Sequence, residues 1–140
     1  MQTPLIWFGG KSKLADDIIR LMPQHRCYVE PFGGGASVIT AKAPVSYEVY
    51  NDIDGEVVNF LMVLRDKPHV LAGKCITIPY SRQLYNEWKW AEKPEDPFER
   101  AVRWFYLNRS AIAAGNNHRS GWRHSSATNP ARDTGLHVTD

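Results

Sequence analysis

The 140-residue sequence predicts an α/β protein with a parallel, doubly wound sheet, and two observations support this prediction. A short apolar run at 27–29 leads into an acid and a turn with three consecutive glycines at 30–36, after which a helix can start. A second strand-like run at 45–50 ends in Asn51 and Asp52. Glycines let the chain turn and approach a ligand closely, and an acid after the second strand can accept hydrogen bonds from ribose hydroxyls. The pattern therefore predicts a site for an adenosine-containing cofactor.

The first half of the chain supplies the strands and the helices that connect them. We predict a first helix from Ser12, as its cap, to about Met22, where Pro23 ends it. Its apolar face is expected to contain Leu14, Ile18, Leu21 and Met22. The first strand and the glycine turn follow, and then a short helix near 37–42 precedes the second strand.

The second half is predicted to be mostly helical. A helix from Asp54 to about Arg65 has an apolar face formed by Val57, Phe60, Leu61 and Leu64. A short helix at 68–73 is expected next, and the pattern at 74–79 fits a strand or an extended loop equally well. Ser81 is the expected cap of a helix that runs through Trp88 and Trp90.

The clearest helix start lies at Asp96, which is followed by Pro97 and by a capping-box glutamate, Glu99. This helix is predicted to run to about Arg109 and to pack Val102, Phe105 and Tyr106. Periodicity ends after Gly115. Two parallel strands cannot bury both faces of such a sheet. Either the helices at 81–109 cover it, or the complete sheet needs strands that this sequence does not contain.

Composition limits the classes of protein to consider. The length fits one domain, and no apolar run approaches the ~20 residues that span a bilayer, so we predict a cytoplasmic protein without a membrane segment. Cys27 and Cys75 are interpreted as reduced core thiols, with a disulfide as the alternative. Residues 101–140 contain five arginines, no lysine and two acids. That balance suits a phosphate-facing surface, and a solvated basic tail is the alternative.

Three common motifs are incomplete in this sequence. A dinucleotide fingerprint starting at Gly33 would require glycine where Val38 stands, and a P-loop ending at 10–12 would require glycine where Leu5 stands. His118 and His124 have no third ligand nearby, so no metal site is predicted.

Three ordered segments resemble one known family. Residues 7–11 (Trp-Phe-Gly-Gly-Lys), 28–38 (Tyr-Val-Glu-Pro-Phe-Gly-Gly-Gly-Ala-Ser-Val) and 51–54 (Asn-Asp-Ile-Asp) are similar to the opening of Dam-like DNA adenine-N6 methyltransferases. The similarity extends through the helix at 97–109 and fades after about Gly121. It implies a Rossmann-like S-adenosylmethionine-dependent methyltransferase fold, incomplete at its C-terminal side.

By this resemblance the cofactor is S-adenosylmethionine. Its binding residues would be Trp7, Lys11, Glu30, Phe32, Gly33, Gly34, Gly35 and Asp52. Lys11 would meet the methionine carboxylate, Asp52 the ribose hydroxyls, and Trp7 would wall the pocket. Each has a structural alternative: Trp7 as core, Lys11 as a solvated charge, Asp52 as a helix cap, and Glu30 as a residue that only polarises the turn. Ala36 replaces the family's last glycine, which is tolerable if its φ is negative.

The catalytic motif of the family is missing. Adenine methylation in this family uses an [Asp/Asn/Ser]-Pro-Pro-aromatic tetrapeptide, which the sequence does not contain; the nearest string, at 96–98, begins a helix. We therefore expect no catalytic residues in the chain, which would be a truncated or partial form that is inactive alone, with a second chain as one source of the catalytic half.

The resemblance implies an adenine-specific methyltransferase acting on double-stranded DNA, with base flipping. Residues 1–109 would form the cofactor-binding core and 110–140 the start of the target-recognition region, with Arg109, Arg119 and Arg123 contacting DNA phosphates. The alternatives are a methyltransferase with another class of substrate and a non-enzymatic cofactor-binding remnant.

Overall fold

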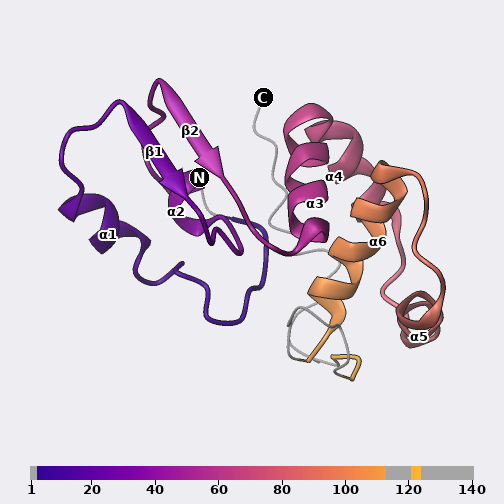
Figure 1. Ribbon diagram of the computed structural model, residues 1–140. Helices are drawn as coiled ribbons and strands as arrows, with labels where there is room; N and C mark the ends of the chain where they lie inside the picture. Colours follow the sequence, from indigo (N-terminus) through magenta and orange to yellow (C-terminus); the bar gives the residue numbers. More distant parts are fainter. Residues whose placement is uncertain (1–2, 113–120, 124–140) are drawn as a thin grey trace.

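A computed structural model describes residues 3–112 and 121–123, and in it a small α/β part lies beside a group of helices (Figure 1). The elements follow in the order α1 (Ala15–Leu21), β1 (Cys27–Glu30), α2 (Ser37–Ala41), β2 (Tyr47–Tyr50), α3 (Gly55–Asp66), α4 (Pro68–Thr77), α5 (Arg82–Trp90) and α6 (Pro97–Ser110). The α/β class and the helical second half are thus as predicted.

The two strands are parallel and are joined through α2. Cys27 lies opposite Tyr47, and Glu30 lies opposite Tyr50. Pairing continues past the strands, because the Asn51 amide donates to the Glu30 carbonyl at 2.9 Å and the Gly33 amide donates to the Asn51 carbonyl at 2.9 Å. The glycine turn and the segment after β2 therefore lie at the same edge of the sheet.

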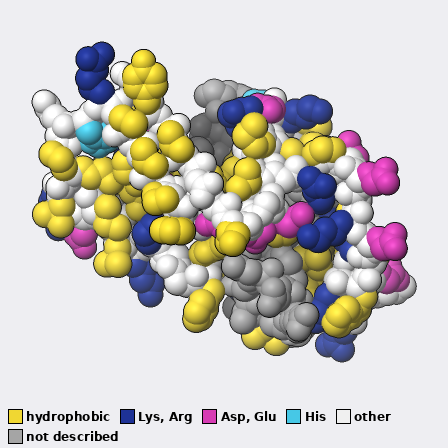
Figure 2. All heavy atoms as spheres, in the orientation of Figure 1, with side chains coloured by type: hydrophobic (Ala, Val, Ile, Leu, Met, Phe, Trp, Pro, Cys, Tyr) yellow, Lys and Arg dark blue, Asp and Glu magenta, His cyan; other side chains and the backbone are white. Residues whose placement is uncertain are grey.

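One face of this sheet is open. Alternate residues Cys27, Val29, Tyr47 and Val49 are exposed, with Val29 and Val49 at 53% and 48%. Hydrophobic side chains accordingly gather on the surface of the part that holds the strands (Figure 2). In the described part of the chain, α5 packs on α6, and α6 packs on α3 and α4. One of the two expectations was that the helices at 81–109 cover the sheet. They do not cover this face.

The main core lies between α3, α4 and α6. Phe60 of α3 is fully buried, with its ring centroid 5.0 Å from that of Phe105 and 5.5 Å from that of Trp104. The other most deeply buried members of this cluster are Val57, Leu71, Ala101 and Val102. The predicted faces of α3 and α6 are confirmed.

The caps predicted for α5 and α6 are also confirmed, and α3 has a side-chain cap of the same kind. Asp54 accepts from the Glu56 amide at 3.0 Å, Ser81 from the Leu84 amide at 3.3 Å, and Asp96 from the Glu99 amide at 2.8 Å. Side-chain acceptors at these positions satisfy amides that have no partner within the helix.

The prediction for the first helix is wrong at its start. The chain turns first, with the Leu14 amide donating to the Lys11 carbonyl at 3.0 Å, and α1 begins at Ala15 without a side-chain cap from Ser12. Its supposed apolar face is not buried, since Leu14 is 57% and Leu21 81% exposed. The segment at 74–79 was expected to be a strand or an extended loop. Neither alternative holds for the whole segment, because α4 continues to Thr77.

The two cysteines differ. Cys75 is buried as predicted, and burial raises the pKa of its thiol to about 12. Cys27 is exposed on β1, so its assignment to the core is wrong; both thiols are free. Among the helices in 3–112, none has the length and apolar character required to cross a membrane.

Candidate functional site

The candidate site is the glycine turn at the carboxyl ends of β1 and β2. A Cβ on Gly33 would lie 2.0 Å from Tyr50 Cε2, and a Cβ on Gly34 would lie 2.7 Å from Trp7 Nε1. Gly34 also has φ 53°, in the left-handed region that favours glycine. Tyr50 closes the turn from the strand side by donating from its hydroxyl to the Gly34 carbonyl at 2.6 Å. Sterics thus require glycine at both positions.

Ala36 ends the turn in an unfavourable conformation. Its φ is 58°, so the condition of a negative φ, under which alanine would be tolerable at this position, is not met. The residue is 1% exposed and its amide donates to the Gly33 carbonyl at 3.0 Å, which holds it in the left-handed region. Such a conformation costs an alanine about 1–2 kcal/mol.

Asp52 is bound to the turn by its carboxylate. Its Oδ2 accepts from the Gly34 amide at 2.8 Å, and its Oδ1 accepts from the Asp54 amide at 3.0 Å. A carboxylate has about four acceptor positions, so each oxygen retains capacity for a further donor. Asp54, not Asp52, caps α3, so the capping alternative for Asp52 is wrong.

Lys11 and Glu30 form an ion pair at the start of the turn. Lys11 Nζ donates to the Phe32 carbonyl at 3.1 Å and lies 3.6 Å from Glu30 Oε1. Glu30 is 5% exposed; its Oε2 accepts from the Ile39 amide at 3.3 Å, and in the described residues Oε1 has no hydrogen-bond partner. Burial raises the pKa of Glu30, and Lys11 opposes that rise. The alternative that Lys11 is only a solvated charge is wrong.

Trp7 packs over the turn from the N-terminal segment. Its side chain is the nearest group to the position of a Cβ on Gly34 and on Gly35, and its carbonyl accepts from the Gly10 amide at 3.1 Å. The Trp7 side chain is partly buried and packs against the main core. It therefore contacts both the core and the glycine turn.

Large apolar side chains stand free around the turn. Phe32 is 81% exposed, and Phe8, which follows Trp7, and Ile53, which follows Asp52, are 87% and 98% exposed. Exposed apolar groups beside polar, hydrogen-bonding ones are typical of a ligand site.

Asn108 is a part of this arrangement that the sequence patterns missed. It is 2% exposed on α6; its Oδ1 accepts from the Ile6 amide at 3.2 Å and its Nδ2 donates to the Ile6 carbonyl at 2.8 Å. A polar residue on the buried side of an apolar helix was the available signal. Only the structure identifies its partner, which lies far away in the sequence.

Two of the three predicted DNA-contacting arginines lie together at the end of α6. Arg109 is half-buried and donates to the Pro4 carbonyl at 3.4 Å, and Arg123 donates to the Arg109 carbonyl at 2.8 Å. Arg119 lies outside the described residues.

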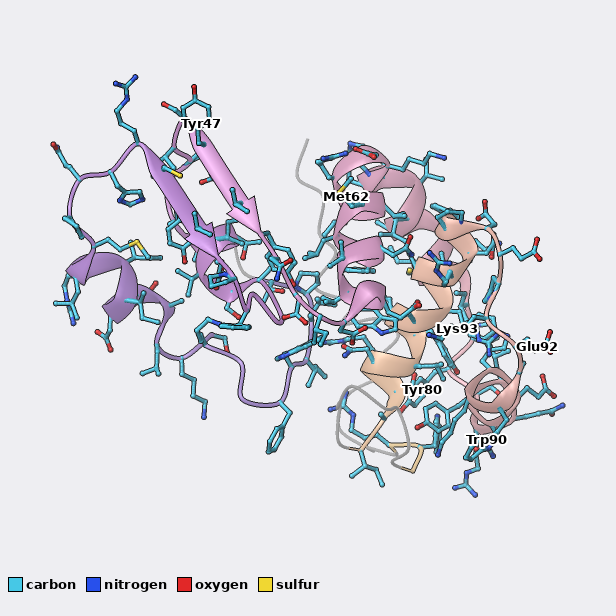
Figure 3. All side chains as sticks on the ribbon, viewed as in Figure 1. Tyr47, Met62, Tyr80, Trp90, Glu92 and Lys93 are labelled. Carbon is cyan, nitrogen blue, oxygen red and sulfur yellow. The ribbon has the colours of Figure 1, made fainter. Side chains whose placement is uncertain are left out.

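Aromatic groups surround the Arg123 end. Trp122 forms an antiparallel bridge with Ala111 and stacks on Tyr80, with centroids 5.0 Å apart, and the Arg82 guanidinium lies 5.1 Å from the Trp122 ring. Tyr80 lies beside the C-terminal end of α6 (Figure 3). The structure thus places cations and aromatic rings together, a combination found where proteins bind nucleic acids.

No group of three or more His, Cys, Asp or Glu side chains in the described ranges could hold a metal ion.

Comparison with known proteins gives a consistent result. A family model described as D12 class N6 adenine-specific DNA methyltransferase matches residues 7–117. DNA adenine methylase of Escherichia coli K12 is 34% identical over 110 residues, which cover 75% of this chain and 39% of that protein. DNA adenine methylase of Salmonella typhi is 36% identical, with the same coverage. DNA N-6-adenine-methyltransferase of Escherichia phage P1 is 26% identical over 114 residues, covering 74% of this chain and 14% of that protein.

Proposed function

Because the chain belongs to the D12 class N6 adenine-specific DNA methyltransferase family, we propose that it binds S-adenosylmethionine and contributes the cofactor-binding part of a DNA adenine methyltransferase. The chain spans 39% of the length of the DNA adenine methylases it matches, so the activity of the whole enzyme is part of this proposal. The observation that carries it is the convergence of Lys11 and Asp52 on the glycine turn.

The fold we propose is Rossmann-like, with residues 1–109 as the cofactor-binding core. The turn at 32–36 would pass under the methionine and ribose portions, since bare glycines permit close approach of a ligand. Asp52 would hold the ribose hydroxyls with the acceptor capacity that its two backbone hydrogen bonds leave. The open apolar face of the sheet would accept further elements, because parallel sheets are normally covered on both faces.

Lys11 and Glu30 would handle the charges of the amino-acid end of the cofactor. Lys11 Nζ has three donors, of which one bonds the Phe32 carbonyl, so it can also meet a carboxylate. Glu30 Oε1 can accept from an ammonium group. Trp7 would wall the pocket beside the sulfonium by cation–π attraction, and Phe32 would add apolar contact. The cofactor, when bound, supplies an electrophilic methyl group.

Transfer to the adenine amine needs hydrogen-bond acceptors on that amine, because its lone pair is conjugated into the ring. The family places these acceptors in a Pro-Pro tetrapeptide that the 140 residues do not contain. We therefore propose that another polypeptide segment, or a second chain, supplies them, and that the 140 residues alone do not methylate DNA. Detection of N6-methyladenine after incubation of the purified chain with duplex DNA, free of host methylase, would refute this.

Residues 110–140 would begin the DNA-recognition region, with Arg109, Arg119 and Arg123 contacting phosphates of double-stranded DNA. Arg123 donates to the Arg109 carbonyl with one of the five donors of its guanidinium, and the Arg109 side chain lies beside it at the end of α6. Replacing one of them should weaken binding to all sequences alike and lower the salt slope by about one.

Calorimetry with S-adenosylhomocysteine tests the cofactor assignment directly. We expect binding by the unmodified chain and at least tenfold weaker binding by the Lys11→Ala and Asp52→Ala variants. Lys13→Ala is the matched control, because Lys13 is an exposed lysine two residues from Lys11. Equal affinity of all four proteins, or no binding by the unmodified chain, would overturn the assignment.

A further inference from the structure

The side-chain amide of Asn108 pairs with the backbone of Ile6 as a neighbouring β-strand would. Its Oδ1 accepts from the Ile6 amide at 3.2 Å, and its Nδ2 donates to the Ile6 carbonyl at 2.8 Å. Only this orientation of the amide group matches the donor and the acceptor of Ile6. Asn108 is 2% exposed, so water does not compete for either bond.

Ile6 immediately precedes the residues that reach the glycine turn. Trp7 packs its indole against Gly34, and its carbonyl accepts from the Gly10 amide at 3.1 Å. Lys11 then donates to the Phe32 carbonyl. The path from α6 to the turn is therefore continuous: Asn108 holds Ile6, Ile6 fixes the Trp7 backbone, and the turn at 7–10 fixes the start of Lys11.

A second contact from α6 supports the same segment, because Arg109 donates to the Pro4 carbonyl at 3.4 Å. Leu5, between these two anchored residues, is 7% exposed in the main core. The segment is thus attached to the packed helix α6 at both Pro4 and Ile6.

We propose that Asn108 is a positioning residue for the cofactor site: it holds the segment that carries Trp7 and Lys11 in register over the glycine turn without touching the ligand. This rests on the proposed function, since the ligand is S-adenosylmethionine or S-adenosylhomocysteine. An aliphatic side chain of similar size would leave both polar groups of Ile6 without these partners, and the segment would lose its fixed register.

Calorimetry with S-adenosylhomocysteine on three proteins tests the proposal: the unmodified chain, Asn108→Ala and Ser110→Ala. Ser110 is the matched control, since it is also a 2% exposed polar residue of α6 and hydrogen-bonds Tyr106. We expect at least tenfold weaker binding by Asn108→Ala and a change of less than about twofold by Ser110→Ala, with faster hydrogen exchange of the Ile6 amide only in the former.

The Asn108→Asp variant adds a pH-dependent measurement and preserves the size of the side chain. A protonated carboxyl can donate to the Ile6 carbonyl and accept from the Ile6 amide, whereas the ionised form can only accept. The affinity of Asn108→Asp relative to the unmodified chain should therefore fall as pH rises through the titration of that carboxyl. A relative affinity near one at every pH, or a fast-exchanging Ile6 amide with unchanged affinity in Asn108→Ala, would overturn the proposal. No binding by the unmodified chain would overturn the cofactor assignment and, with it, this role.

Discussion

Replacing Gly34 with alanine should destabilise the fold by about 2–5 kcal/mol, and two effects contribute. Gly34 has φ 53°, a conformation that costs a residue with a Cβ about 1–2 kcal/mol. The added Cβ would also lie 2.7 Å from Trp7 Nε1, and overpacking of this kind typically costs about 1–3 kcal/mol. Ala36 adopts φ 58° in the same turn, so the chain tolerates the first effect alone, and the overlap with Trp7 is decisive.

Urea denaturation followed by circular dichroism measures this loss. Gly73→Ala is the matched control: the same methyl group is added in the interior of α4, where its Cβ would meet nothing within 4 Å. That change should stabilise the chain by about 0.5–1 kcal/mol, because glycine is unfavourable inside a helix. A double-mutant cycle of Gly34→Ala with Trp7→Ala should show favourable coupling. If Gly34→Ala unfolds at the same urea concentration as the unmodified chain, the steric reasoning is wrong.

Three further predictions concern buried groups. Burial raises the pKa of Glu30 in the folded chain. Protonation of Glu30 therefore stabilises the fold fully below the ordinary glutamate pKa of 4.5, and this stabilisation is lost as pH rises through the raised pKa of the folded chain. Glu30→Gln should therefore gain stability relative to the unmodified chain as pH rises in urea titrations, and a pH-independent difference would contradict this. Burial raises the pKa of Cys75 to about 12, so at about pH 8 a thiol reagent should modify exposed Cys27 and reach Cys75 only in denaturant; rapid reaction of both thiols in the native chain would argue against it. Phe60→Ala should cost about 3–5 kcal/mol in chemical denaturation, because Phe60 is fully buried and stacks on Phe105; a loss below about 1 kcal/mol would be inconsistent with that packing.

The parts of the fold that were predictable are those with local causes. Ser81 and Asp96 cap α5 and α6 because a side-chain oxygen can reach an amide three residues ahead. The glycine turn was predictable because consecutive glycines after an apolar run have few other uses. The apolar period of α3 likewise identified Val57 and Phe60 as core.

The parts that were wrong or missed depend on groups distant in sequence. Leu14 and Leu21 have the spacing of a buried face, but whether that face finds a partner is not encoded in the spacing. Ala36 has a positive φ in a tightly buried turn where its amide bonds the Gly33 carbonyl, and a sequence pattern does not specify that conformation. Hydrophobic periodicity could not predict the hydrogen bonds of Asn108, because their partner Ile6 lies near the opposite end of the described chain.

The bond between Ile6 and Asn108 also sets an order of events during synthesis. A ribosome releases Ile6, Trp7 and Lys11 early, together with the strands and the glycine turn, but their anchor emerges only with the last turns of α6. Contacts between residues so far apart form late and slowly. The nascent chain can therefore form the glycine turn first and can fix Trp7 and Lys11 beside it only when α6 is complete.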